Sequence, residues 1–293
     1  MTFRIYIFFF ICLGLSWMPA QGENYENEIT ICSFNIRGSN MDTGVNAWSN
    51  RKKMVIREFT NYRYDIVCMQ EPLADQVQDF LSIGIYEWLG VSAQGTADTD
   101  VFTPIFYNKK KLNVLDYGTF WLSETPDVVS KGWDGKFPRI CTWAKFRDIE
   151  NCRTFYVFNT HLDHVGTIAK LEGARLICKK IKEMTTEEAV FITGDMNSIP
   201  GTPPVNAFLS EFINSRDIAT EKSGPAGTAH SYGKLYPPSQ IDYIFVNEYV
   251  SVTQAVTITK NSDPVYMSDH YPIVITADSV SYTHLRAHET RGN

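Results

Sequence analysis

Short strand-like runs recur along the whole chain, and most of them end in polar residues. The run Ile29–Ile36 (ITICSFNI) alternates apolar and polar side chains, and Asp65–Met69 (DIVCM) is an apolar run typical of a buried strand. Besides these two, strands are expected at Pro104–Tyr107, Leu112–Leu122, Ile140–Phe146, Thr154–Thr160, Ala189–Thr193, Ile241–Val246 and Ile273–Ala277.

Apolar residues at helical spacing predict helices between these strands. The longest is Ile168–Met184, which places Leu171, Ala174 and Ile177 on its buried side. Strands outnumber helices, and hairpins mix with strand-helix-strand units. Two sheets packed face to face, with helices outside, would bury these patterns, so we expect an α/β fold. The other expected helices are Asn46–Tyr62, Ala74–Leu81 and Val205–Phe212.

The N-terminal segment has the order of a secretory signal peptide. Arg4 precedes an apolar run that ends at Trp17, and small residues follow at Ala20 and Gly22. The alternative is a membrane anchor, but the run is shorter than the roughly 20 apolar residues of a membrane span. We therefore expect residues 1–22 to be cleaved, with no stable membrane insertion afterwards, and the protein to be secreted or periplasmic.

The C-terminal segment, residues 280–293, is excluded from the expected fold as well. This leaves one domain at residues 23–279. Residues 280–293 (VSYTHLRAHETRGN) show no periodicity, and we expect an extraneous or disordered tail. Without the two ends, the formal net charge changes from −6 to near −8. Nucleic-acid binders usually carry a basic footprint, so a nucleic-acid partner is an alternative that is not favoured.

Cysteine usage does not indicate a disulfide framework. Of six cysteines, Cys12 lies in the signal segment, which leaves an odd number at irregular spacing. Cys141 and Cys152 lie on consecutive expected strands, and a bridge between them would be compatible with an oxidising compartment. The sequence leaves open whether that bridge forms.

Clusters of Asn, Glu, Asp and His follow the expected strands. A single Asp or Asn after a strand is usually a turn former or a helix cap, and a single His is usually structural. Strand ends that converge on one rim of a sheet sandwich would instead gather these groups into one pocket. The clusters are Ser33–Arg37, Met69–Pro72, Asn159–His164, Thr193–Asn197, Gln240–Tyr243 and Ser268–Pro272.

In this order the clusters resemble the endonuclease/exonuclease/phosphatase superfamily, of which deoxyribonuclease I has the best-known fold, and in particular its secreted bacterial members. The resemblance spans about Ile29 to Ala277 and implies a four-layer α/β sandwich, in which two packed mixed β-sheets are flanked by helices. Met196 replaces a more usual Phe and should only pack. The matching motifs are Phe34-Asn35, Gln70-Glu71, Thr160-His161, Gly194-Asp195-x-Asn197, Asp242-Tyr243 and Ser268-Asp269-His270.

The resemblance implies a metal site of oxygen ligands. Phosphoester hydrolysis spreads negative charge over oxygen atoms, and a hard divalent cation held by carboxylate and amide oxygens stabilises that charge. Glu71 is implied as the principal magnesium ligand, with Asn35 beside it and Asp269 as a further ligand. The expected cofactor is Mg2+, with Mn2+ as an alternative.

Five further residues are expected to carry the chemistry. Asp195 is the candidate to accept the proton of the attacking water, and Asn197 to hold the phosphate or the water. His270 fits a general base or a phosphate contact, and the resemblance implies Asp242 as the residue that orients it. His161 would donate to a phosphate oxygen in the transition state.

Three residues are candidates for substrate binding. Tyr107 matches a family tyrosine that contacts the phosphate, although an ordinary strand aromatic fits equally well. Arg139 ends a loop, Lys131–Arg139, that resembles a stretch of secreted bacterial members; it would bind phosphate bidentately or form an exposed salt bridge. Asp163 shares the side of its strand with His161, which would place it at the pocket.

We therefore expect a secreted, divalent-metal-dependent phosphoester hydrolase. The acidic charge favours a small phosphorylated substrate, such as a sugar phosphate, an inositol phosphate or a lipid headgroup. One alternative is an extracellular nuclease. Another, of a different class, is a catalytically inactive protein that binds phosphorylated ligands; the retention of every catalytic residue type argues against it. Fold and motif do not fix the substrate.

Overall fold

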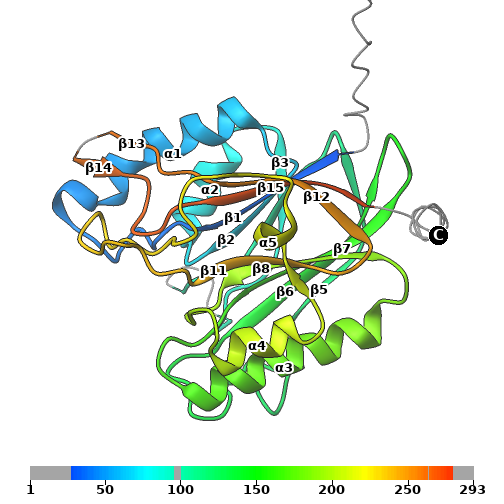
Figure 1. Ribbon diagram of the computed structural model, residues 1–293. Coiled ribbons are helices and arrows are strands. Elements are labelled where there is room, and N and C mark those ends of the chain that lie inside the picture. The colour runs from blue at the N-terminus through cyan, green and yellow to red at the C-terminus, as the bar shows by residue number, and fades with distance from the viewer. Residues whose placement is uncertain (1–27, 96–99, 263, 280–293) are drawn as a thin grey trace, which may run out of the picture.

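The computed structural model describes residues 28–95, 100–262 and 264–279. Two β-sheets pack face to face and helices cover both outer faces, so the expected four-layer α/β sandwich is confirmed (Figure 1). The signal peptide expected at 1–22 and the tail expected at 280–293 lie outside the described residues. No helix in the described part of the chain is both long and apolar enough to span a bilayer.

The first sheet has seven strands and contains the first and last strands of the domain side by side. Its strand β1 runs parallel to β2 and antiparallel to β15. In spatial order the strands are β10 (Glu221–Ser223), β12 (Val250–Thr257), β15 (Ile273–Ser279), β1 (Glu28–Asn35), β2 (Ile66–Gln70), β4 (Ile105–Asn108) and β3 (Tyr86–Leu89).

The second sheet has six strands, formed mostly by the middle of the chain. A long hairpin pairs its first two strands, and a helix connects β7 to the parallel β8. In spatial order the strands are β5 (Leu112–Trp121), β6 (Ile140–Asp148), β7 (Thr154–His161), β8 (Ala189–Asp195), β11 (Asp242–Val246) and β9 (Ile213–Asn214). A separate two-stranded ribbon pairs β13 (Asn261–Ser262) with β14 (Val265–Tyr266).

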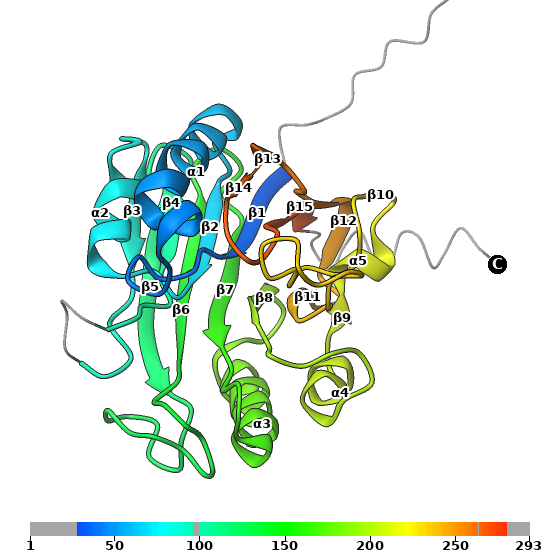
Figure 2. The same cartoon turned by 90° about the vertical axis from the view of Figure 1, so that its left-hand side faces the viewer.

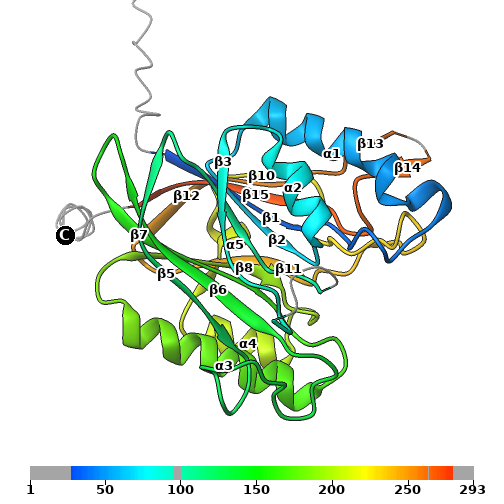
Figure 3. The same cartoon turned by 180° about the vertical axis from the view of Figure 1, so that it is seen from behind.

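Helices α1 and α2 lie over the first sheet and α3 and α4 over the second, as Figures 2 and 3 show from the side and from behind. Phe59 of α1 and Phe80 of α2 pack against the outer face of the first sheet. Ile177 of α3 and Phe208 of α4 pack against the outer face of the second. The helices are η2 (Gly44–Asn46), α1 (Trp48–Tyr62), α2 (Ala74–Leu81), α3 (Thr167–Met184), α4 (Pro203–Leu209) and α5 (Ser215–Ile218).

The core between the sheets is apolar over most of its length and becomes polar toward one rim. Successive residues of a strand point to opposite faces, so every second residue enters this core. In β1 the inward series begins with Ile29 and Ile31 and ends with Ser33 and Asn35. The inward residues of β2, β7 and β8 follow the same order, so their polar ends collect at one place.

A buried hydrogen-bonded layer separates the apolar core from that rim. Gln70 Nε2 donates to Asn159 Oδ1 over 2.8 Å and to Ser33 Oγ over 3.2 Å, which joins the two sheets. Asn159 Nδ2 donates to two backbone carbonyls of the first sheet region, and Thr193 Oγ1 lies 3.3 Å from Asn159 Oδ1. Partnered amides of this kind fix the register of the two sheets just below the rim.

The cysteine bridge that the sequence left open is not formed. Cys141 is buried in β6 beside Thr160, whereas Cys152 is exposed in the turn beyond the other end of that strand. Both are free thiols, as are Cys32, Cys68 and Cys178.

Candidate active site

The predicted catalytic and metal-binding residues converge where the polar ends of the two sheets meet. Asn35 of the first sheet donates from Nδ2 to Asp195 Oδ2 of the second over 3.0 Å, and to Glu71 Oε1 over 3.2 Å. Across the same gap, His270 Nδ1 lies 2.8 Å from Asp242 Oδ2. Of these side chains, Glu71, Asp195 and His270 line a cavity of about 440 Å3. The site is therefore built by both sheets together.

Unusual backbone conformations turn the chain into the site directly after three strands. Arg37, Glu71 and Asn197 have φ angles of 62°, 70° and 45°, in the left-handed region that ordinary residues rarely adopt. Such backbone strain concentrates at functional sites. Gly194 precedes Asp195 because any Cβ there would collide with the Thr160 carbonyl on the neighbouring strand. The conformations aim the side chains at the rim of the sandwich.

Asp195, Asp242 and His270 form a tightly coupled buried group. Their ligand-type atoms all lie within 4.8 Å of one another. Burial and the Asp242 carboxylate raise the pKa of Asp195 to about 7. Burial alone would lower the pKa of His270, but the Asp242, Asp195 and Asp269 carboxylates outweigh it and raise that pKa to about 10. His270 is therefore a cation at neutral pH, and Asp195 can exchange a proton there.

His161 and Asn197 lie directly against this group, with His161 Nε2 3.5 Å from Asp195 Oδ2. Asn197 Nδ2 lies 3.0 Å from His161 Nε2 and also donates to the Leu162 carbonyl over 3.0 Å. The backbone N–H of Asn197 donates to Asp195 Oδ1 over 2.8 Å. Burial, with the positive charge of Arg139, holds the pKa of His161 well below its ordinary value. His161 is thus a neutral imidazole beside a charged one.

The predicted metal ligands fit a hard divalent cation. Glu71 Oε2 and Asp242 Oδ1 are buried without a hydrogen-bond partner among the described residues. A buried carboxylate oxygen without a donor is costly unless a cation satisfies it. Asp269 lies near Glu71, because Arg37 Nη1 is within 4 Å of both carboxylates. Oxygen ligands of this kind are those that Mg2+ and Mn2+ take.

Arg139 reaches the cavity, as predicted. It does so together with His164, to which the sequence assigned no role. Arg139 Nη2 lies 3.2 Å from His164 Nδ1, and both residues line the cavity. Arg139 Nε is buried without a hydrogen-bond partner in the described part of the chain. A buried guanidinium with unused donors is well placed to receive an anionic oxygen.

Asp163 does not line the cavity, contrary to expectation. Its carboxylate is 2% exposed and accepts four backbone N–H bonds, from Lys136, Phe137, Val165 and Gly166. Burial would raise the pKa of Asp163, but these donors outweigh it and lower that pKa. The carboxylate ties two loops together and lies 3.8 Å from Arg139 Nε, so it positions its surroundings.

Tyr107 is also placed away from the other site residues. It pairs with Ile66 at the far end of β2 from Glu71. Its hydroxyl donates to Glu87 Oε2 over 2.9 Å, and its ring lies against Phe146 in the core between the sheets. The alternative of an ordinary strand aromatic describes this residue, because the direction of β4 carries it away from the rim.

Arg37 is a site residue to which the sequence assigned no role. Its Nη1 lies 3.9 Å from Glu71 Oε2 and 3.8 Å from Asp269 Oδ2. Its Nε donates to Asp42 Oδ2 over 3.2 Å. Arg37 stands inside the first polar cluster of the sequence, but only the fold shows that its side chain bends back over two predicted metal ligands.

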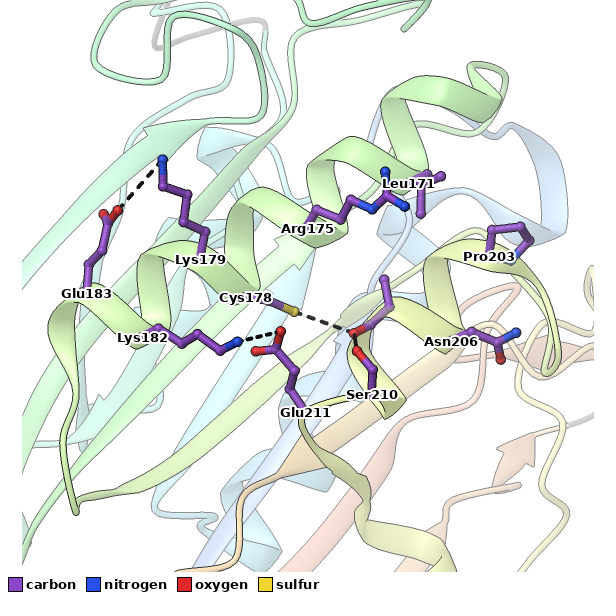
Figure 4. Close-up of a pocket in the computed structure, with 11 residues that line it drawn as sticks. Leu171, Arg175, Cys178, Lys179, Lys182, Glu183, Pro203, Asn206, Ser210 and Glu211 are labelled. Carbon is purple, nitrogen blue, oxygen red and sulfur yellow. Dashed lines mark hydrogen bonds and ion pairs between the residues drawn. The ribbon is translucent and has the colours of Figure 1, made fainter.

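A second hollow, of about 720 Å3, lies between α3 and α4 on the outer face of the second sheet (Figure 4). Its basic side chains are paired with carboxylates: Lys182 with Glu211 over 2.8 Å and Lys179 with Glu183 over 3.8 Å. No histidine lines it. The acid-base groups of the described residues gather instead in the cavity between the sheet ends.

Comparisons with known proteins agree with this geometry. The sequence model of the Endonuclease/Exonuclease/phosphatase family matches residues 32–270, a range that contains both halves of the site. The crystal structure of an endonuclease/exonuclease/phosphatase from Bacteroides vulgatus is 33% identical with a TM-score of 0.83, covering 86% of this chain and 99% of that one.

Two further relatives cover most of the chain. A mannosyl-6-phosphatase structure from Bacteroides thetaiotaomicron is 30% identical with a TM-score of 0.79, covering 85% of this chain and 99% of that one. An uncharacterised protein of Acanthamoeba polyphaga mimivirus is 27% identical over 251 residues, which are 78% of this chain and 91% of the viral protein. The chain therefore belongs to the endonuclease/exonuclease/phosphatase family of phosphoesterases.

Proposed function

We propose that the protein is a divalent-metal-dependent hydrolase of small phosphorylated molecules, with a sugar phosphate as the favoured substrate. The observation that carries the proposal is the set of acidic and imidazole groups that two sheets bring to one cavity. His270, which is paired with the buried Asp242, lines this cavity together with the buried Asp195 and with Glu71, which has an unpartnered oxygen. Hydrolysis of a phosphoester requires this combination of charge stabilisation and proton transfer.

Glu71, Asn35 and Asp269 would hold the ion, for which we propose Mg2+ with Mn2+ as the alternative. When bound, the ion supplies a positive charge next to the phosphate oxygens. Asn35 holds Glu71 and Asp195 in fixed positions through its Nδ2 group. The carboxylates therefore do not need to rearrange before the substrate arrives.

Asp195 and His270 divide the proton chemistry. Asp195, with a pKa raised to about 7, can accept the proton of a water that attacks phosphorus. His270, held as a cation by Asp242, directs positive charge at a phosphate oxygen rather than acting as a base. The P–O bond to the leaving group then breaks, and the leaving oxygen takes a proton from the site or from solvent.

The size and charge of the site support a small substrate. A cavity of about 440 Å3 is within the range of small-molecule sites. Arg139 and His164 lie at its wall, and the chain is acidic overall. The mannosyl-6-phosphatase name of one relative adds support for a phosphate monoester of a sugar.

We also propose that the protein is exported. The support is the order of the first 22 residues, a basic start followed by an apolar run and small residues. The N-terminus of secreted material, read by mass spectrometry, should lie near Glu23. Retention of Met1 on a membrane-bound form would contradict export in this form.

A hydrolysis screen tests the proposed function. The protein is assayed with magnesium, and with a chelator, on mannose 6-phosphate, inositol phosphate, phosphocholine and single-stranded DNA. The expected result is phosphate release from the sugar phosphate that the chelator abolishes. Faster cleavage of DNA would favour the nuclease alternative. Tight binding without turnover of any substrate would favour a phospho-ligand-binding protein.

A further inference from the structure

Arg37 places a guanidinium between the two carboxylates that are proposed to hold the metal. Its Nη1 lies 3.9 Å from Glu71 Oε2 and 3.8 Å from Asp269 Oδ2, and it lines the cavity. Among the described residues, neither carboxylate forms an ion pair with any other basic side chain. Arg37 therefore occupies the electrostatic position of a cation in the acidic pair.

The backbone of Arg37 is fixed from three directions. Its N–H donates to Asn35 Oδ1 over 3.1 Å. Its carbonyl accepts from Arg51 Nη2 and from Gln76 Nε2, each over 3.0 Å. Arg51 is fully buried, so it is itself a rigid support. The segment that carries the guanidinium therefore cannot swing away from the site as a loop would.

The side chain is tethered as well. Asp42 Oδ2 accepts from Arg37 Nε over 3.2 Å and from the Tyr232 hydroxyl over 2.7 Å, so two loops share one carboxylate. Burial would lower the pKa of Arg37, but Asp269, Glu71 and Asp42 outweigh it and raise that pKa. The charge is permanent at every pH at which the protein folds.

A fixed positive charge has a direct consequence for an incoming cation. Two carboxylates alone would present two negative charges to a divalent ion, and the Arg37 guanidinium, which Asp42 also contacts, makes the potential at this place less negative. The guanidinium also repels the ion over a few ångströms, where the interaction of charges in a partly buried site is strong. A tightly bound metal is therefore not what this arrangement favours.

We propose that the positive charge of Arg37 competes with a divalent ion for the carboxylates of Glu71 and Asp269. It thereby weakens their affinity for the ion, so that the metal exchanges readily with the medium. Arg37 is thus a positioning residue that sets metal occupancy. The inference rests on the proposed metal site but not on the identity of the substrate.

Direct metal titration tests the inference without any substrate. Mn2+ binding is followed by electron paramagnetic resonance and Mg2+ binding by calorimetry, in the wild type, Arg37→Gln and Arg37→Met. Both neutral variants should lower the Kd by about tenfold or more, which is about 1.4 kcal/mol. Arg37→Lys keeps a charge at this position, so its Kd should stay within about threefold of the wild type. Circular dichroism verifies the fold of each variant.

The matched control is Arg175→Gln, because Arg175 is an exposed arginine of α3 that pairs with Glu172, away from the cavity. It should leave the Kd unchanged. Folded Arg37→Gln and Arg37→Met proteins that bind Mn2+ no more tightly than the wild type would overturn the inference and leave the proposed function standing. Absence of Mn2+ and Mg2+ binding in the wild type and in both neutral variants would overturn both.

Discussion

His270 Nδ1 lies 2.8 Å from Asp242 Oδ2, and this contact joins the two sheets of the sandwich. Asp242 begins β11 of the second sheet, whereas His270 precedes β15 of the first. With Nδ1 directed at the carboxylate, Nε2 is the ring nitrogen left for a substrate oxygen. The pair therefore fixes both the charge and the orientation of the imidazole.

Asp242→Asn should lower turnover by about 10²- to 10⁴-fold, the usual contribution of a positioned acid-base group. The amide keeps the size of the side chain but removes the charge that raises the pKa of His270. Steady-state kinetics on the best substrate of the screen measures the loss. An NMR titration of the His270 ring should show a lower pKa in the variant. An unchanged turnover would mean that the pair is structural.

The stability of the metal-free protein should fall as the pH rises from about 7 to about 10. The folded pKa of His270 is about 10, above its ordinary 6.5. Protonated His270 therefore stabilises the fold fully below pH 6.5, and that stabilisation is lost as the pH rises through the folded pKa. Asp195, with its pKa near 7, adds no further change at the upper end of this window.

Urea unfolding in the presence of a chelator, at a series of pH values, measures this dependence. His270→Gln removes the titrating group, so the variant should lack that part of the slope between pH 7 and 10. If the two proteins show parallel curves, the pKa of His270 is not raised in the fold.

Glu71→Gln should keep the fold and abolish metal-dependent turnover, because the neutral amide removes the charge that attracts the ion. Calorimetry with Mg2+ should show weaker binding than in the wild type. The control Glu150→Gln changes an exposed glutamate and should behave as the wild type. Combined with His270→Ala, the loss should be smaller than the sum of the single losses, since groups that act together are not additive.

Asp163→Asn should destabilise the protein by about 1–3 kcal/mol, the cost of leaving buried donors without a good acceptor. Four backbone N–H groups converge on this carboxylate. Because its folded pKa is lowered, its contribution is present near neutral pH and is lost as the pH falls through that pKa. The wild type and the variant should therefore converge in stability in acid.

Thermal unfolding compares Asp163→Asn with Asp127→Asn, which changes an exposed aspartate in the connection between β5 and β6, the loop that donates two of these hydrogen bonds. The control should be neutral. A variant of Asp163 as stable as the control would show that the loop does not depend on this carboxylate.

Most strands of the two sheets were predictable from their apolar runs, whereas one long strand with a backbone bulge was not. Ala74–Leu81 is helical as predicted, because its apolar residues follow one helical face. Strand β12 was missed. Its buried residues are Val250 and Val252 before the register shift, and Ala255 and Thr257 after it. The bulge moves the buried face by one residue, so no simple period of two remains.

The convergence of Asn35, Glu71 and His270 was predictable because each follows or precedes a strand of one sandwich. The positions of Tyr107 and Asp163 were not predictable, because they depend on strand direction and on tertiary hydrogen bonds. Neither the apolar periodicity nor the sequence motifs contain this information. Strand direction takes Tyr107 to the far end of β2. The Asp163 carboxylate accepts hydrogen bonds from backbone N–H groups of a loop that is distant in sequence. Side-chain direction beyond a strand end is decided by tertiary contacts.

The pairing of β1 with β15 has a consequence for when activity can first appear. Strand β1 is synthesised first, but its sheet is complete only after β15, the last strand, has been synthesised. Asp269 and His270 precede β15 by a few residues, so they too are synthesised late. A nascent chain, or one still being translocated during the proposed export, therefore carries Glu71 and Asp195 without the histidine that completes them. The site can therefore be assembled only after nearly the whole domain has been synthesised.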